Sequence, residues 1–225
     1  MAVRARTAAL LLFLGLPGAA LGACPPQAGA AIRFELDDPE PRVEPPLPAA
    51  ELAMRDGPAP AGHHHLGLTT SQVAWRTEMS LRLQPRPGGV LCAVPTELRL
   101  RLVHQEHVIR LAAELPRGGC LEREVLAHER RHAEVNRRTL RDAATELRRT
   151  AEAWAARAST EARSAEEAGE ALQRDLQQAI APVLAQLRAA REEAHDRIDS
   201  EEEYRRLGQV CAEDQRRLQD ALGRR

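Results

Sequence analysis

The chain has 225 residues, with 32 basic and 33 acidic side chains and a formal net charge of -1. The two signs are interleaved and leave no one-signed patch, which argues against nucleic acid as a partner. Aromatic residues make up only 2% of the chain, so we expect a single thin core built from Leu, Val and Ala.

The N-terminus has the order of a secretory signal. Two arginines come first, then an apolar run at residues 8–16, a Pro-Gly pair and small residues at 19–23. The apolar run is far shorter than the ~20 residues that a membrane-spanning helix needs. We therefore expect residues 1–23 to be a signal peptide and the mature chain to be exported.

Residues 21–24, Leu-Gly-Ala-Cys, resemble a lipobox, where bacterial lipoprotein signals are cut and the new N-terminal cysteine is acylated. Lipidation at Cys24 would anchor the chain to the membrane, because more than one acyl chain is attached. We then expect a periplasmic protein held at the outer membrane. The alternative is ordinary cleavage after residues 20–22, which leaves Cys24 as half of a disulfide in a secreted protein.

The cysteines at 24, 92, 120 and 211 allow three pairings if all four keep their thiols. A lipidated Cys24 leaves three. For an oxidising compartment we pair Cys92 with Cys120, which flank the predicted strands, and leave Cys211 unassigned.

Residues 24–65 are rich in Pro and small residues, a composition typical of an extended tether. Within it, residues 32–36 alternate apolar and charged side chains and predict a short edge strand. The run His63-His64-His65 can bind divalent metals loosely. Residues 66–225 form the predicted domain.

Apolar residues on alternate positions predict three strands, at residues 73–83, 98–102 and 108–111. Pro and Gly at 85–89 predict a turn after the first. We expect a small antiparallel meander. Helical spacing of apolar residues then predicts a long amphipathic helix at about 121–158, followed by a helical region at about 160–222. The fold class is α+β, with a C-terminal helical hairpin beside the sheet.

The predicted long helix carries the motif His128-Glu129-Arg130-Arg131-His132. Residues four apart project from the same helix face, so His128 and His132 can reach one metal ion. Two neutral imidazoles bind Zn²⁺, and Glu129 would act as general base on a water molecule. No nucleophile elbow, P-loop, dinucleotide fingerprint or clustered CxxC is present, which removes serine hydrolase, nucleotide and redox functions.

Over residues 67–203 the chain resembles the predicted secreted zinc-dependent proteases of bacterial envelopes. The resemblance rests on the start Gly67-Leu68-Thr69-Thr70, on Trp75, on Leu115-Pro116 and on the histidine motif. It implies a zincin-like fold, bound Zn²⁺ and a peptide or protein substrate. It also implies a third ligand in a stretch that ends in Thr-x-His-Gly. The best local match is residues 195–201, in which Asp196 is kept, Asp199 replaces Thr and Glu201 replaces the ligand histidine.

Carboxylate oxygen is an acceptable third zinc ligand, so Glu201 is the predicted one. Glu202, Glu203 and His195 lie within a few residues and are the alternatives. His104 and His107 could also donate, although such residues are more often surface histidines of a strand. Tyr204 is the only tyrosine and could donate a hydrogen bond to an oxyanion, although a packing role is the more common one.

Two functions follow from these residues. The first is a zinc metallopeptidase of the envelope with Glu129 as general base. The second is a non-catalytic envelope lipoprotein that acts as a helical scaffold, whose exposed faces around Arg137-Arg138 and Arg148-Arg149 bind a partner. The divergent third-ligand stretch is the feature in favour of the second. The sequence does not determine the oligomeric state.

Overall fold

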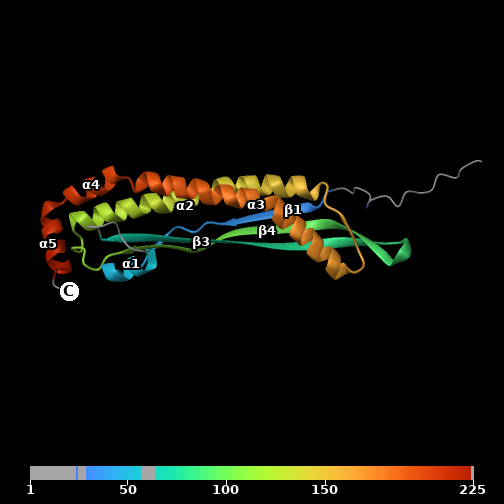
Figure 1. Ribbon diagram of the computed structural model, residues 1–225, viewed down its shortest axis with the longest axis horizontal. Helices are drawn as coiled ribbons and strands as arrows, with labels where there is room; N and C mark the ends of the chain where they lie inside the picture. Colours follow the sequence, from blue (N-terminus) through green and yellow to red (C-terminus); the bar gives the residue numbers. More distant parts are fainter. Residues whose placement is uncertain (1–23, 25–28, 57–63, 224–225) are drawn as a thin grey trace, which may run out of the picture.

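The computed structural model describes residues 24, 29–56 and 64–223 (Figure 1). The predicted signal peptide at residues 1–23 lies outside them. The elements in chain order are β1 Ala31–Asp37, β2 Arg42–Val43, α1 Ala49–Asp56, β3 Gly67–Arg86, a 3₁₀ turn Pro87–Gly89, β4 Val90–Leu111, α2 Cys120–Ala155, β5 Thr160–Ala162, α3 Ala165–Ile198, α4 Glu201–Gln209 and α5 Ala212–Leu222.

The long strands β3 and β4 form an antiparallel hairpin that runs along the molecule (Figure 1). Gly88 and Gly89 in its turn have φ of 81° and 75°, a left-handed backbone that glycine adopts most readily. The predicted turn is confirmed. Residues 98–102 and 108–111, predicted as two strands, are both part of β4.

The sheet has β4 at its centre. β1 and β2 lie parallel to β4, whereas β3 and β5 lie antiparallel to it. The mixed α and β content agrees with the prediction, but the small antiparallel meander is wrong. Alternating apolar residues indicate which face of a strand is buried and say little about its neighbours or their direction.

The predicted tether is folded over most of its described length. β1 pairs with residues 97–103 of β4, and Ile32 and Phe34 pack against the core while their neighbours face solvent. Leu52 of α1 is fully buried in a second apolar cluster. The edge strand is therefore confirmed and the tether is wrong for residues 31–56. Their backbone groups find hydrogen-bond partners in a strand far along the chain, which local composition does not reveal.

α2 and α3 lie side by side over one face of the sheet (Figure 1). Leucines at 98, 100 and 102 of β4 pack against residues of both helices, including Trp154 and Leu176, so the core lies between the two layers. The predicted long helix and helical hairpin are confirmed by α2 and α3. The region 160–222 also contains the short strand β5. Its helical part is divided into three helices, with breaks after Ile198 and Gln209, and α3 continues through Pro182 without a break.

Two disulfides link Cys24 to Cys92 and Cys120 to Cys211. The predicted pair Cys92–Cys120 is wrong, because Cys92 lies near the start of β4 and Cys120 follows its far end. Roughly 60 Å of extended strand separates those two ends, and a disulfide needs Cα atoms within about 7 Å. The predicted lipidation at Cys24 is also wrong in this structure, because the sulfur that would carry the lipid is bonded to Cys92.

The two disulfides indicate an oxidising environment of the kind that exported proteins meet. In the part of the chain that the structure describes, every helix is too short or too polar to cross a membrane.

Candidate metal centre

The histidine motif lies in the first third of α2, as the sequence predicts. His128 and His132 project from the same face toward the interior, where they are 6% and 8% exposed. Their Nε2 atoms lie 3.1 Å apart. One helical turn separates two side chains four residues apart, which brings both imidazoles to a common point.

A third donor comes from the end of α3. Asp199 follows the last residue of that helix, and its Oδ1 lies 3.1 Å from Nε2 of both His128 and His132. The three donor atoms therefore form a compact triangle. Two imidazoles and one carboxylate on such a triangle can hold a single divalent cation.

Asp199, and not the predicted third ligand Glu201, is the carboxylate that the structure brings to the two histidines. Glu201 opens α4 with an exposed side chain, and Glu202 beside it is exposed too. Ser200 caps α4, accepting a hydrogen bond from the backbone N–H of Glu203. The chain therefore changes direction between α3 and α4, and the residue at the end of α3 faces the histidines. The comparison with Thr-x-His-Gly aligned Asp199 with a threonine, which concealed its role.

The alternatives His195 and Glu203 lie in an outer layer. His195 Nε2 is 3.0 Å from the Oδ1 of buried Asn136, and its Nδ1 is 2.7 Å from Nδ1 of His132. Asn136 Oδ1 is an acceptor, so His195 carries its proton on Nε2 and accepts on Nδ1 from His132. With a metal ion in the triangle, that hydrogen bond would leave the lone pair of His132 Nε2 directed at the ion, the form that a metal ligand requires. Without the ion, Nε2–H of His132 donates to Asp199.

His128 has a carboxylate on its outer side. Glu203 Oε1 lies 3.4 Å from Nδ1 of His128, and Nη2 of Arg131 lies 3.1 Å from the same nitrogen. Glu203 is itself held by Arg131 and Arg206. Hydrogen bonds from Arg206 and Arg131 lower the pKa of Glu203 to about 2, so this carboxylate is ionised. A charged outer partner orients a ligand imidazole and increases its basicity.

The charges of the triangle depend on one another. Burial alone would lower the pKa of His128, but the hydrogen bond with Asp199 and the charges of Glu129 and Asp199 outweigh it and raise that pKa. For Asp199, burial raises the pKa, and the hydrogen bonds with both histidines more than offset it and hold the pKa well below its usual range. The pocket is thus built to place one negative charge between two imidazoles.

Glu129 lies beside the triangle and is only 5% exposed. Its Oε2 accepts a 2.6 Å hydrogen bond from Oγ1 of Thr69 at the start of β3. Burial raises the pKa of Glu129, although the Thr69 hydrogen bond opposes the shift. A carboxylate with a raised pKa is suited to accept a proton and release it again near neutral pH.

The triangle opens into a cavity of about 830 Å³. His128, Glu129 and His132 line it together with Thr69 from β3, while Tyr204 of α4 and Leu218 of α5 line it from the C-terminal helices. The rings of Tyr204 and His128 have centroids 6.4 Å apart. Tyr204 therefore lines the same cavity as the predicted metal-binding histidines.

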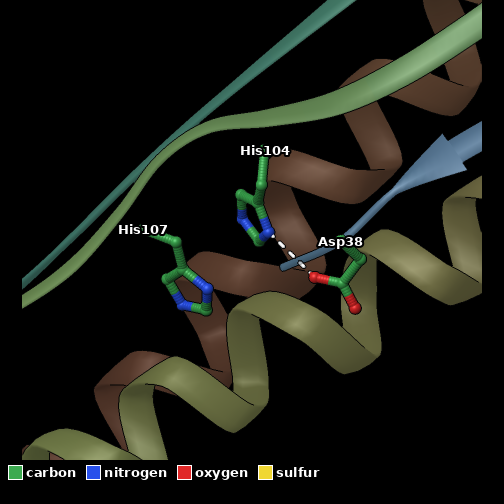
Figure 2. A group of neighbouring side chains, drawn as sticks. All are labelled: Asp38, His104 and His107. Carbon is green, nitrogen blue, oxygen red and sulfur yellow. Dashed lines mark hydrogen bonds and ion pairs between the residues drawn. The ribbon is translucent and has the colours of Figure 1, made fainter. Parts of the chain in front are cut away.

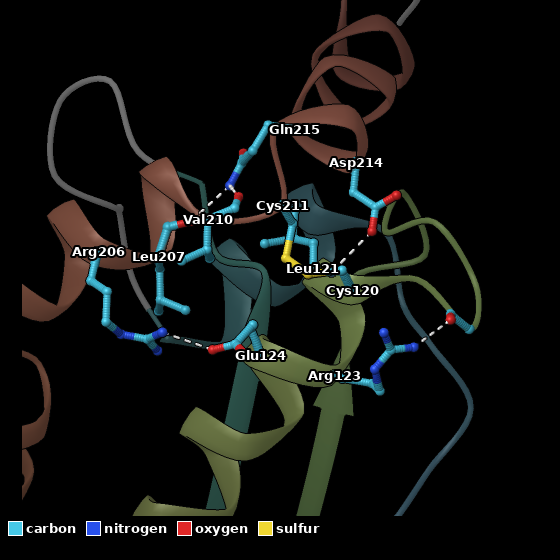
Figure 3. Close-up of a disulfide and its surroundings, with 11 residues drawn as sticks. Cys120, Leu121, Arg123, Glu124, Arg206, Leu207, Val210, Cys211, Asp214 and Gln215 are labelled. Atoms are coloured by element: carbon cyan, nitrogen blue, oxygen red, sulfur yellow. Dashed lines mark hydrogen bonds and ion pairs between the residues drawn. A yellow bond between two sulfur atoms is a disulfide. The ribbon is translucent and has the colours of Figure 1, made fainter.

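The wall formed by α5 is fastened to the start of α2 (Figure 3). Cys120, the first residue of α2, is bonded to Cys211, which precedes α5. Asp214 of α5 accepts a 3.0 Å hydrogen bond from the backbone N–H of Leu121, so it satisfies an otherwise unpaired donor at the N-terminus of α2. These links hold the C-terminal helices beside the motif.

His104 and His107 do not reach this centre. Both are buried, 4% and 3% exposed, so the expectation of surface histidines is wrong. They form a separate group with Asp38.

Comparison with protein-family models, with curated proteins and with solved structures found no match.

Proposed function

We propose that the chain is an exported zinc-dependent metallopeptidase that acts in an oxidising compartment such as the bacterial periplasm. The observation that carries the proposal is the triangle of His128, His132 and Asp199 beside the buried carboxylate of Glu129, since all four residues line one cavity.

The donor set suits Zn²⁺. Catalytic zinc sites have three protein ligands and keep a further position for water or substrate, and two imidazoles with one carboxylate are such a set. The outer nitrogen of each imidazole also has a partner, His195 for His132 and Glu203 for His128. Outer partners of this kind are typical of metal ligands.

The reaction that fits is hydrolysis of a peptide bond by water. Bound Zn²⁺ supplies Lewis-acid chemistry, because it lowers the pKa of water and polarises a carbonyl oxygen. Glu129 accepts the proton of the attacking water and passes it to the leaving amine. Thr69 holds the carboxylate in place through Oε2. Tyr204 lines the same cavity and would donate to the developing oxyanion.

The cavity favours a peptide substrate with an apolar side chain. Leu218 and Leu222 of α5 and Leu68 of β3 line it together with the ionisable groups of the triangle. A cavity that combines apolar side chains with convergent polar groups is a common form of substrate site.

The non-catalytic alternative has less support. The feature in its favour was the divergent third-ligand stretch, but Asp199 offers a carboxylate beside the two histidines in place of that ligand. Two of the four arginines that it needs as partner sites also have partners within the chain, since Arg137 pairs with Asp38 and Glu40, and Arg149 pairs with Glu146.

The test uses untagged mature chain and an unfolded protein substrate labelled with a self-quenching fluorophore. We expect one tightly held zinc at the triangle and cleavage that stops when a chelator removes it. Glu129→Gln should keep that zinc and lose cleavage by about 100-fold or more. His128→Ala should lose both. Chain without zinc after purification, or Glu129→Gln that cleaves like the wild type, would overturn the proposal.

A further inference from the structure

A second group of metal-ligating side chains lies away from the first centre. Asp38 follows β1, and His104 and His107 lie on β4, with α2 packed beside them (Figure 2). In a regular strand, residues three apart point to opposite faces. Here a β-bulge intervenes, because His104 pairs with Val73 and Glu106 with Gln72, which leaves Gln105 without a partner in β3. The extra residue turns His104 and His107 to the same side.

The group is compact and buried. His104 Nδ1 lies 3.0 Å from Oδ1 of Asp38, and the two imidazole rings stack with centroids 4.3 Å apart. One ligand atom of each residue lies within 4.8 Å of the others. Arg137 holds the second oxygen of Asp38 at 3.2 Å, so Oδ1 is left facing the histidines.

His107 is the residue that this packing leaves unexplained. It is 3% exposed, and neither of its ring nitrogens makes a hydrogen bond of acceptable geometry with a described residue, although the backbone of Pro39 lies close enough to act on its pKa. A buried polar group without a partner costs about 1–3 kcal/mol, so such groups are rare in folded proteins. Burial lowers the pKa of His107 to about 4, and the neutral ring has a lone pair available for a ligand.

We propose that Asp38, His104 and His107 bind a second divalent cation of the Zn²⁺ class in a buried structural site. Two imidazoles and a carboxylate are borderline ligands that suit Zn²⁺ better than Ca²⁺ or Mg²⁺. None of the three lines the cavity of the first centre. The ion would therefore fasten the end of β1 to β4. Arg191 and Arg137 lie close enough to lower the pKa of His104, and their positive charges oppose the binding of a cation.

A neighbouring serine, Ser71, suggests a second interpretation of the group. Its Oγ lies 2.7 Å from Nε2 of His104, so Ser71, His104 and Asp38 have the order of a serine-hydrolase triad. The side chain of His104 is fully enclosed, and Ser71 does not line the cavity. A triad also gives no role to His107. In the metal site, Nε2–H of His104 donates to Ser71, which directs the lone pair of Nδ1 toward the ion.

The test removes the first centre. In full-length mature chain carrying His128→Ala and His132→Ala, with residues 63–65 replaced by serine, we expect equilibrium dialysis to find one Zn²⁺ per chain. Co²⁺ should give visible absorption bands. Zn²⁺ should raise the unfolding midpoint by about 4 °C or more. Peptidase activity plays no part in these measurements, so the result is independent of the proposed function.

Adding His107→Leu to that chain should abolish binding. Leucine is accommodated because the nitrogens that it removes have no partners. Ser71→Ala is the matched control and should still bind one ion. Two results would overturn the site. One is that the chain with His107 intact unfolds cooperatively but binds no metal. The other is that the chain with His107→Leu binds metal equally well. Labelling of Ser71 by a fluorophosphonate would do the same in favour of a triad.

Discussion

Gly67 lies directly against Glu129. A Cβ atom at position 67 would come within 2.7 Å of Cγ and 2.8 Å of Cδ of Glu129. Such distances are far below van der Waals contact. The first residue of β3 therefore has to be glycine for the carboxylate of Glu129 to keep its position beside the two histidines.

Gly67→Ala should move the general base without removing the metal ligands. We expect kcat to fall by about 100-fold, because a displacement of about 1 Å at a catalytic group has that effect. Bound zinc, measured by mass spectrometry of the metal, should stay at the wild-type level. Gly169→Ala is the control, since its Cβ meets no atom within 4 Å and the residue does not line the cavity. Equal activity of the two variants would contradict this role of Gly67.

Substitutions of Asp199 and Glu201 test which carboxylate binds the metal. Asp199 lies beside the two histidines, whereas Glu201 is the residue that the motif comparison indicates. Asp199→Ala should weaken zinc binding by more than about 100-fold, because a ligand contributes more than the 10- to 100-fold of an outer partner. Glu201→Ala should leave the affinity unchanged, since its side chain is exposed at the start of α4. Competition with a chromophoric chelator measures both. The opposite ranking would restore Glu201.

The disulfide between Cys120 and Cys211 should matter for substrate more than for metal. Replacing both with serine frees the wall of the cavity that α5 forms, whereas His128, His132 and Asp199 do not contact it directly. We expect KM to rise several-fold with zinc retained. The double substitution should also lower the free energy of unfolding by about 2–4 kcal/mol. A matched substitution of Cys24 and Cys92 should leave KM unchanged.

The metal-free chain should lose stability as the pH falls. Burial lowers the pKa of His107 from its ordinary value of 6.5 to about 4. The unfolded chain therefore takes up a proton at this residue before the folded chain does. The contribution of His107 is complete above about pH 6.5 and declines as the pH falls toward about 4. Urea unfolding in the presence of a chelator measures it.

His107→Leu provides the comparison for that measurement. The variant lacks the titrating group, so its stability should decline less steeply over the same pH range than that of the wild type. Parallel curves for the two proteins would show that His107 does not titrate as its burial implies. His195, whose pKa burial also lowers to about 4, contributes the same trend in both proteins.

Patterns that depend on neighbours in sequence were sufficient for part of this protein. The helical periodicity predicts α2, and the four-residue spacing of His128 and His132 places both on one face, because helix geometry is local. The glycine-rich turn predicts the β3–β4 hairpin for the same reason. Alternation at residues 32–36 correctly predicts β1, although it does not indicate which strand β1 pairs with.

Contacts between distant residues were decided only by the tertiary structure. Asp199 meets His132 across 67 positions, and the two disulfides join cysteines 68 and 91 positions apart. A β-bulge, which depends on pairing with β3, turns His104 and His107 to one side. By itself the sequence identified the histidines that could bind a metal, but it did not single out Asp38 or Asp199. The packing of α3 and β1 on the α2–β4 layers decided which carboxylate meets each pair of histidines, because long-range contacts depend on how whole elements pack.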